Sequence, residues 1–128
     1  MLNVIAICMG ASAGALSRWG LSLWLNPGGL IPWGTLTANL IGAYLVGICL
    51  AVFQVVPHLD PVWRVAIVTG FLGGLTTFSS FSAEVVYLMQ QARYALAFGT
   101  AMVHVGGSLL LTFAGYHTAT LLLPSALR

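Results

Sequence analysis

Residues 70–84 read GFLGGLTTFSSFSAE and lie inside an otherwise apolar stretch that runs from about Val62 to Gln90. Two adjacent glycines at its centre are followed by five hydroxyl residues in seven positions. Glycine weakens a helix, whereas Ser and Thr side chains can cap a helix that starts again. The pattern therefore predicts a break in the helix from about Gly74 to Ser80. The alternative is a continuous helix whose hydroxyls bond back to its own carbonyls.

The composition places this stretch in a membrane. Hydrophobic residues make up 59% of the chain, charged residues 5%, and the mean hydropathy is +1.00. Water-soluble domains carry about 25% charged residues, so a water-soluble fold is excluded. With four arginines, no lysine and two acids, the chain also has no basic surface for a nucleic acid.

Four apolar stretches account for nearly all of the 128 residues. They run over about Leu2–Leu25, Trp33–Val56, Val62–Gln90 and Ala95–Leu123, and each is long enough for a spanning helix of about 20 residues. Turn-forming residues separate or end them, namely Asn26-Pro27-Gly28-Gly29, Pro57 to Pro61, Gln90 to Tyr94 and Pro124. We expect an all-α membrane protein with one domain, residues 1–128, and the third helix broken near the midplane.

The first stretch lacks the positive charge that opens a secretory signal, so we expect residues 2–24 to be retained. Its small residues include Gly10 and Gly14, at the spacing that lets membrane helices approach closely. The same run could mimic a cleavage site. Cys8 and Cys49 lie in apolar stretches without metal-ligand spacing, which indicates buried small hydrophobes.

Polar residues recur every four positions along the last stretch: Thr100, His104, Ser108 and Thr112. Such spacing lines one helix face over about 18 Å. A ladder of this kind forms either a seam between helices or the wall of a permeation path. No second ligand stands at metal spacing beside His104, so a transition-metal site is not expected.

The charges give no preferred orientation. With four spans, Arg64 and Arg128 fall on one side of the membrane and Arg18 and Arg93 on the other. Orientation follows an imbalance of Lys and Arg near the span ends, and two against two is no imbalance. The count suggests a chain that inserts both ways and pairs into an antiparallel dimer.

Residues 70–84 closely resemble the signature of the Fluc (CrcB-type) fluoride channels. Residues 14–18 (GALSR) and 33–42 (WGTLTANLIG) add to the resemblance, which covers nearly the whole chain. It implies a fluoride-selective channel that passively exports cytoplasmic fluoride across the bacterial inner membrane and confers fluoride resistance. It also implies a dual-topology antiparallel homodimer with two pores and one structural sodium ion at the dimer centre.

The resemblance also assigns residues. Phe78, Phe81 and Asn39 correspond to pore residues, Ser108 and Thr112 to a polar track, and the backbone carbonyls of Gly73 and Thr76 to the sodium ligands. Asn39, Ser108 and Thr112 can replace the hydrogen bonds of a dehydrated anion, and phenylalanine ring edges carry positive charge toward it. Further candidates for the pore or its vestibule are Arg18, Ser79, Ser80, Glu84 and His104.

Two other functions remain as alternatives. A small multidrug-type proton-coupled transporter is also a four-helix dimer, but in that family the essential acid lies in the first helix. Here the candidate acid, Glu84, is in the third. The second alternative is a membrane subunit that only packs against other helices and transports nothing. An enzyme is not expected, because Ser, His and carboxylate residues form no catalytic constellation.

Overall fold

The computed structural model describes residues 1–26, 28 and 31–123. Its elements are α1 (Leu2–Leu25), α2 (Trp33–Val55), α3 (Pro61–Arg64), η1 (Val65–Leu72), α4 (Gly73–Leu75), α5 (Phe78–Gln90) and α6 (Tyr94–Leu122). Every expected span boundary is confirmed to within one residue. The described residues contain helices and no strand. Pro27, Gly29, Pro124 and Arg128, which the sequence placed in loops or at a span end, lie outside them.

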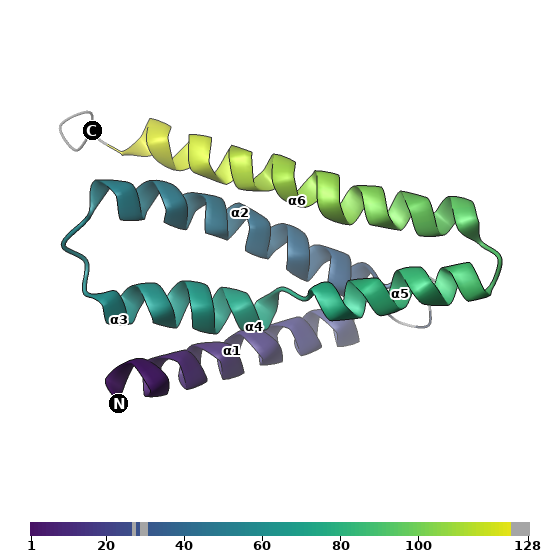
Figure 1. Ribbon diagram of the computed structural model, residues 1–128, viewed down its shortest axis with the longest axis horizontal. Coiled ribbons are helices and arrows are strands. Elements are labelled where there is room, and N and C mark those ends of the chain that lie inside the picture. The colour runs from purple at the N-terminus through teal and green to yellow at the C-terminus, as the bar shows by residue number, and fades with distance from the viewer. Residues whose placement is uncertain (27, 29–30, 124–128) are drawn as a thin grey trace.

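Within the described part of the chain, four helical segments are long and apolar enough to cross a membrane. They are Leu2–Leu25, Trp33–Val55, Pro61–Gln90 and Tyr94–Leu122. The protein is thus a multi-pass membrane protein. The start of α1, the α2–α3 connection and the end of α6 lie at one end of the molecule (Figure 1).

The third span is interrupted where the sequence predicted. Helix α4 ends at Leu75, and α5 begins at Phe78. Between them Thr76 (φ −84°, ψ 153°) and Thr77 (φ −149°, ψ 120°) are extended, and the ribbon narrows visibly between α4 and α5 (Figure 1). The break is confirmed, and the alternative of a continuous helix is wrong.

A second irregularity precedes the break and was not predicted. Residues Val65–Leu72 form η1, a π-helix of eight residues. Its wider turn, closed by hydrogen bonds over five residues, is rare in proteins and is often found at functional sites. The third span therefore changes its helical geometry before it stops.

Close backbone contacts at glycines hold the spans together. A Cβ atom on Gly14 would overlap the Phe71 carbonyl oxygen of η1 and lie 2.7 Å from the backbone nitrogen of Leu75. A Cβ atom on Gly47 of α2 would overlap the Thr112 carbonyl oxygen of α6. The packing interpretation of the small residues in the first span is thus confirmed, and α2 and α6 form a similar seam.

Candidate functional site

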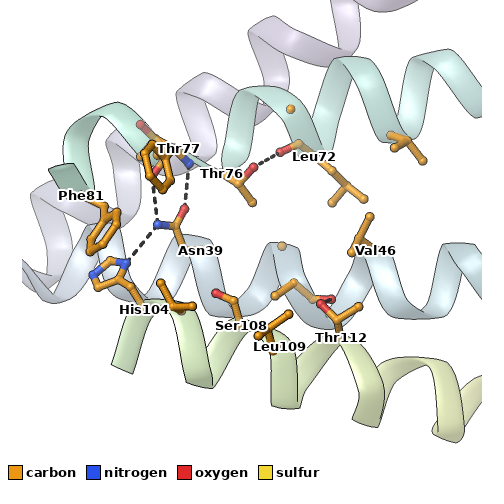
Figure 2. Close-up of a pocket in the computed structure, with 16 residues that line it drawn as sticks. Asn39, Val46, Leu72, Thr76, Thr77, Phe81, His104, Ser108, Leu109 and Thr112 are labelled. Atoms are coloured by element: carbon orange, nitrogen blue, oxygen red, sulfur yellow. Dashed lines mark hydrogen bonds between the residues drawn. The ribbon is translucent and has the colours of Figure 1, made fainter. Parts of the chain in front are cut away.

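Asn39 of α2 holds the break in the third span (Figure 2). Its Oδ1 accepts a hydrogen bond from the backbone N–H of Thr77 at 2.7 Å, and its Nδ2 donates to the Thr77 carbonyl at 3.0 Å. In a continuous helix the Thr77 N–H would bond the Gly73 carbonyl. The Asn39 amide therefore replaces the helical hydrogen bond of the Thr77 N–H, and the Gly73 carbonyl is left without this donor.

Thr77 begins the helix that follows the break. Its Oγ1 accepts a hydrogen bond from the backbone N–H of Ser80 at 3.1 Å, which is the usual action of an N-cap residue. The Ser80 N–H would otherwise bond the Thr76 carbonyl. The hydroxyls of Ser79 and Ser80 also hydrogen-bond Thr77 Oγ1, so both candidate vestibule residues belong to this cap.

A cavity of about 510 Å³ lies beside the break, between α2, α6 and the third span (Figure 2). Its wall contains every residue that the sequence assigned to the pore and to the sodium site: Asn39, Gly73, Thr76, Phe78, Phe81, Ser108 and Thr112. These residues come from three spans that are distant in sequence. The fold therefore brings the predicted site residues together.

Phe78 and Phe81 sit on the first turn of α5 and meet edge to face. Their ring centroids are 5.4 Å apart and the ring planes are inclined by 70°. Phe81 is 8% exposed, whereas Phe78 is 77% exposed. Phe81 thus closes the cavity from inside the chain, and Phe78 lines it from the exposed side.

The polar stripe of α6 divides between two cavities. His104, Ser108 and Thr112 line the large cavity, while Thr100 and His104 line a smaller one of about 140 Å³ at the α2–α6 seam. Thr112 Oγ1 donates to the Ala43 carbonyl at 3.1 Å. Ser108 makes no side-chain hydrogen bond within the described residues. The stripe is therefore both a helix contact, through Thr112, and a cavity wall.

His104 is 4% exposed and contacts both neighbouring helices. Its ring stacks on Phe81 of α5 with the centroids 4.6 Å apart, and its Nδ1 lies 3.1 Å from Asn39 Nδ2. Asn39 Nδ2 carries two hydrogens, and the second partner is the Thr77 carbonyl. Both amide hydrogens of Asn39 are thus engaged within the chain, which the sequence did not indicate.

Arg18 and Glu84 reach into the protein. Arg18 Nε donates to the Gly74 carbonyl at 3.2 Å, so this half-buried side chain supports the break. Glu84 hydrogen-bonds Thr35 of α2, and its Oε2 is buried without a partner among the described residues. Neither side chain lines the two cavities.

The metal-ligating side chains do not cluster. No group of three His, Cys, Asp or Glu residues that could hold a metal ion occurs in residues 1–26, 28 and 31–123. Oxygen ligands are available instead at the break, where the Gly73 and Thr76 carbonyls lose their helical N–H partners. A hard monovalent cation suits such backbone oxygens.

Residues 5–116 match the family model described as "CrcB-like protein, Camphor Resistance (CrcB)". The chain belongs to the CrcB family. Relatives that are similar over almost the full length of the chain confirm this membership. A protein of Albidiferax ferrireducens is 70% identical over 96% of this chain and 95% of its own. A protein of Paracidovorax citrulli is 62% identical over 93% and 94%, and one of Variovorax paradoxus is 63% identical over 90% and 92%.

All three relatives carry the name "Fluoride-specific ion channel FluC". The family resemblance that the sequence motifs suggested is thus confirmed. These proteins are named as channels, so the CrcB family is one of transporters and not of enzymes.

Proposed function

We propose that this protein is a fluoride-selective ion channel that passively releases cytoplasmic fluoride through a pore beside the break in its third span. The names of its relatives support fluoride as the ion. The observation that carries the proposal is the cavity of about 510 Å³ in which Phe78, Phe81 and Ser108 converge at the break.

The chemistry of this cavity suits a small, strongly hydrated anion. Fluoride that sheds water needs replacement hydrogen bonds, and Ser108 offers a hydroxyl that no described residue uses. The ring edges of Phe78 and Phe81 carry positive charge and exclude bulk water. Helix α5 starts at this level, and its positive end favours an anion. Thr112 and Asn39 complete the polar wall.

We infer further that two copies assemble head to tail, with a pore on each side of the dimer. One chain leaves Phe78 77% exposed at the cavity mouth, where a second copy would cover it. None of the large side chains among the described residues is less than 2% exposed, so a single chain has a thin core. The balance of arginines between the two ends supports an antiparallel arrangement.

A sodium ion at the dimer centre fits the break. The Gly73 and Thr76 carbonyls of each copy would hold it, since both are freed from helical bonding and both residues line the cavity. The ion would tie the two copies together and fix the broken segments. Gly73 is exposed, so its backbone is accessible to a partner.

We propose the bacterial inner membrane as the site of action and fluoride resistance as the role. Neutral hydrogen fluoride crosses membranes from acidic surroundings, the cytoplasm traps the anion, and a channel lets the membrane voltage expel it. Such passive export does not require proton transport coupled to the movement of fluoride. Only two acidic residues occur in the chain, and one of them, Asp60, lies in a connection, which leaves little material for a proton relay.

The proposal is tested by fluoride efflux from liposomes that contain only the purified protein, with chloride as the control ion. We expect rapid release of fluoride and none of chloride. Phe78→Ile should abolish release, whereas Phe98→Ile should not, because Phe98 is also exposed (68%) but lies outside the cavity. No release by dimeric wild-type protein would overturn the channel and favour a packing subunit.

A further inference from the structure

The hydrogen bonds of Asn39 fix the direction of its amide. The backbone N–H of Thr77 can only donate, so the atom 2.7 Å from it must be the Asn39 oxygen. The Thr77 carbonyl can only accept, so the atom 3.0 Å from it must be the Asn39 nitrogen. The second hydrogen of that nitrogen therefore points to His104.

The orientation of the Asn39 amide determines which ring nitrogen of His104 carries the proton. Asn39 Nδ2 has no lone pair to accept a hydrogen bond, and His104 Nδ1 lies 3.1 Å away from it. Nδ1 must therefore be the acceptor. In a neutral imidazole the proton then resides on the other nitrogen, Nε2. A protonated Nδ1 would set two donors against each other.

His104 Nε2 lies on the side of the ring away from Asn39 (Figure 2). It makes no hydrogen bond within residues 1–26, 28 and 31–123, and it is not one of the fully buried unpaired atoms there, which are Arg64 Nε and Glu84 Oε2. Its N–H is thus a donor that no described residue uses, on a side chain that lines both cavities.

Asn39 and Thr112, which line the large cavity with His104, have no such unused donor. Asn39 uses both amide hydrogens, and the Thr112 hydroxyl donates to Ala43. Phe81 covers one face of the imidazole and restricts its rotation. Ser108, one helical turn further along α6, and Thr100, one turn before, carry cavity hydroxyls that make no hydrogen bond to the described chain.

We propose that Asn39 is a positioning residue that acts through His104, holding the neutral imidazole in its Nε2–H form so that this N–H donates to the permeating anion. The inference rests on the proposed fluoride channel and assigns the donor at this level to His104. Asn39 thereby serves the pore twice, since the same amide also pairs with Thr77 at the break.

Nitrogen-15 NMR of the protein in lipid nanodiscs tests the tautomer without any transport. The chain has three histidines, and the signals of His104 are those missing from His104→Phe. We expect an unprotonated Nδ1 and a protonated Nε2. In Asn39→Asp an oxygen faces Nδ1, and Nδ1 should become protonated. A protonated Nδ1 in the wild type would overturn the proposal.

Fluoride efflux from liposomes tests the donor. His104→Gln keeps an N–H near the position of Nε2, whereas the shorter amide of His104→Asn reaches only the position of Nδ1 and leaves no N–H at that of Nε2. His104→Phe keeps only the stacking on Phe81. We expect His104→Gln to conduct best of the three and the other two to lose on the order of ten- to a hundredfold, the effect of one hydrogen bond to a charged partner. Equal conduction by His104→Phe and wild type would overturn the donor role.

The two failures are distinguishable. If wild-type protein releases fluoride but the NMR signals show Nδ1 protonated, the channel stands and the Asn39–His104 mechanism is overturned. If wild-type protein releases no fluoride, the proposed channel and the anion-donor role are both overturned.

Discussion

Asn39 and Thr77 are 38 residues apart in sequence and are joined by two hydrogen bonds, from Thr77 N–H to Asn39 Oδ1 at 2.7 Å and from Asn39 Nδ2 to the Thr77 carbonyl at 3.0 Å. A side-chain amide thus satisfies both polar groups of one residue in an interrupted helix. Unpaired backbone groups are costly in an apolar environment. The break exists at this position because α2 supplies the amide.

Replacing this amide should destabilise the fold. In Asn39→Leu both polar groups of Thr77 lose their partner, and each unpaired group costs about 1–3 kcal/mol. We expect a clearly lower midpoint of thermal unfolding in detergent micelles. The control is Asn3→Leu, since Asn3 is an exposed residue near the start of α1. Equal midpoints for the two variants would contradict the anchoring role of Asn39.

The cap of α5 makes a smaller contribution that a single hydroxyl tests. Thr77→Val removes the acceptor of the Ser80 N–H while it keeps the shape of the side chain. Loss of such a cap costs about 1 kcal/mol, so we expect a modest fall in unfolding midpoint and Thr77→Ser to restore it. A serine variant as unstable as the valine variant would show that the hydroxyl is not the source of stability.

The sequence predicts the break because its signals are local. Adjacent glycines weaken the helix and hydroxyl residues can restart it, and all of them lie within the same ten residues. It cannot decide which hydroxyl residue becomes the cap, because Thr76 and Thr77 are adjacent and chemically identical. Backbone dihedral angles distinguish them, and Asn39 sets these angles from a different helix.

Other parts of the site depend on contacts that no local pattern encodes. The stripe on α6 indicates that His104, Ser108 and Thr112 share a face, and the structure confirms this. The partners of that face come from α2 and α5, so the pairing of His104 with Asn39 appears only in three dimensions. The π-helix η1 is likewise not marked by a local pattern, because its residues before Gly70 are apolar apart from Thr69 and include no glycine or proline.

The seam between α2 and α6 should be intolerant of a single methyl group. In Gly47→Ala the new Cβ would overlap the Thr112 carbonyl oxygen and lie 2.8 Å from the Tyr116 backbone nitrogen. Backbone atoms cannot turn aside, so the helices must separate, at a cost of about 1–3 kcal/mol. Gly106→Ala is the matched control, because its Cβ would meet nothing within 4 Å.

Thermal unfolding of both glycine variants and fluoride efflux from liposomes are the measurements. Separation of α2 from α6 would also displace Thr112 and His104 in the cavity wall. We therefore expect Gly47→Ala to lower both stability and flux, while Gly106→Ala remains close to wild type. If Gly47→Ala matched wild type in both measurements, the close approach of the two helices would be wrong.

Arg64 stabilises the C-terminal end of α2 and offers the last test. Its Nη2 lies 3.3 Å from the Phe53 carbonyl and 3.4 Å from the Val56 carbonyl, and its guanidinium stands 5.2 Å from the centre of the Phe53 ring. The final carbonyls of a helix have no partner within the helix, and a cation is favourable there. Arg64 therefore ties the start of the third span to the end of the second.

Arg64→Met should remove these contacts while it keeps the apolar stem of the side chain. We expect a loss of about 1–3 kcal/mol, measured as a lower unfolding midpoint. Arg64→Lys should recover only part of it, because an ammonium lacks the planar fork that serves two carbonyls and a ring. Arg93→Met is the control, since Arg93 is exposed, and a fall of equal size there would show that general charge, and not this contact, stabilises the protein.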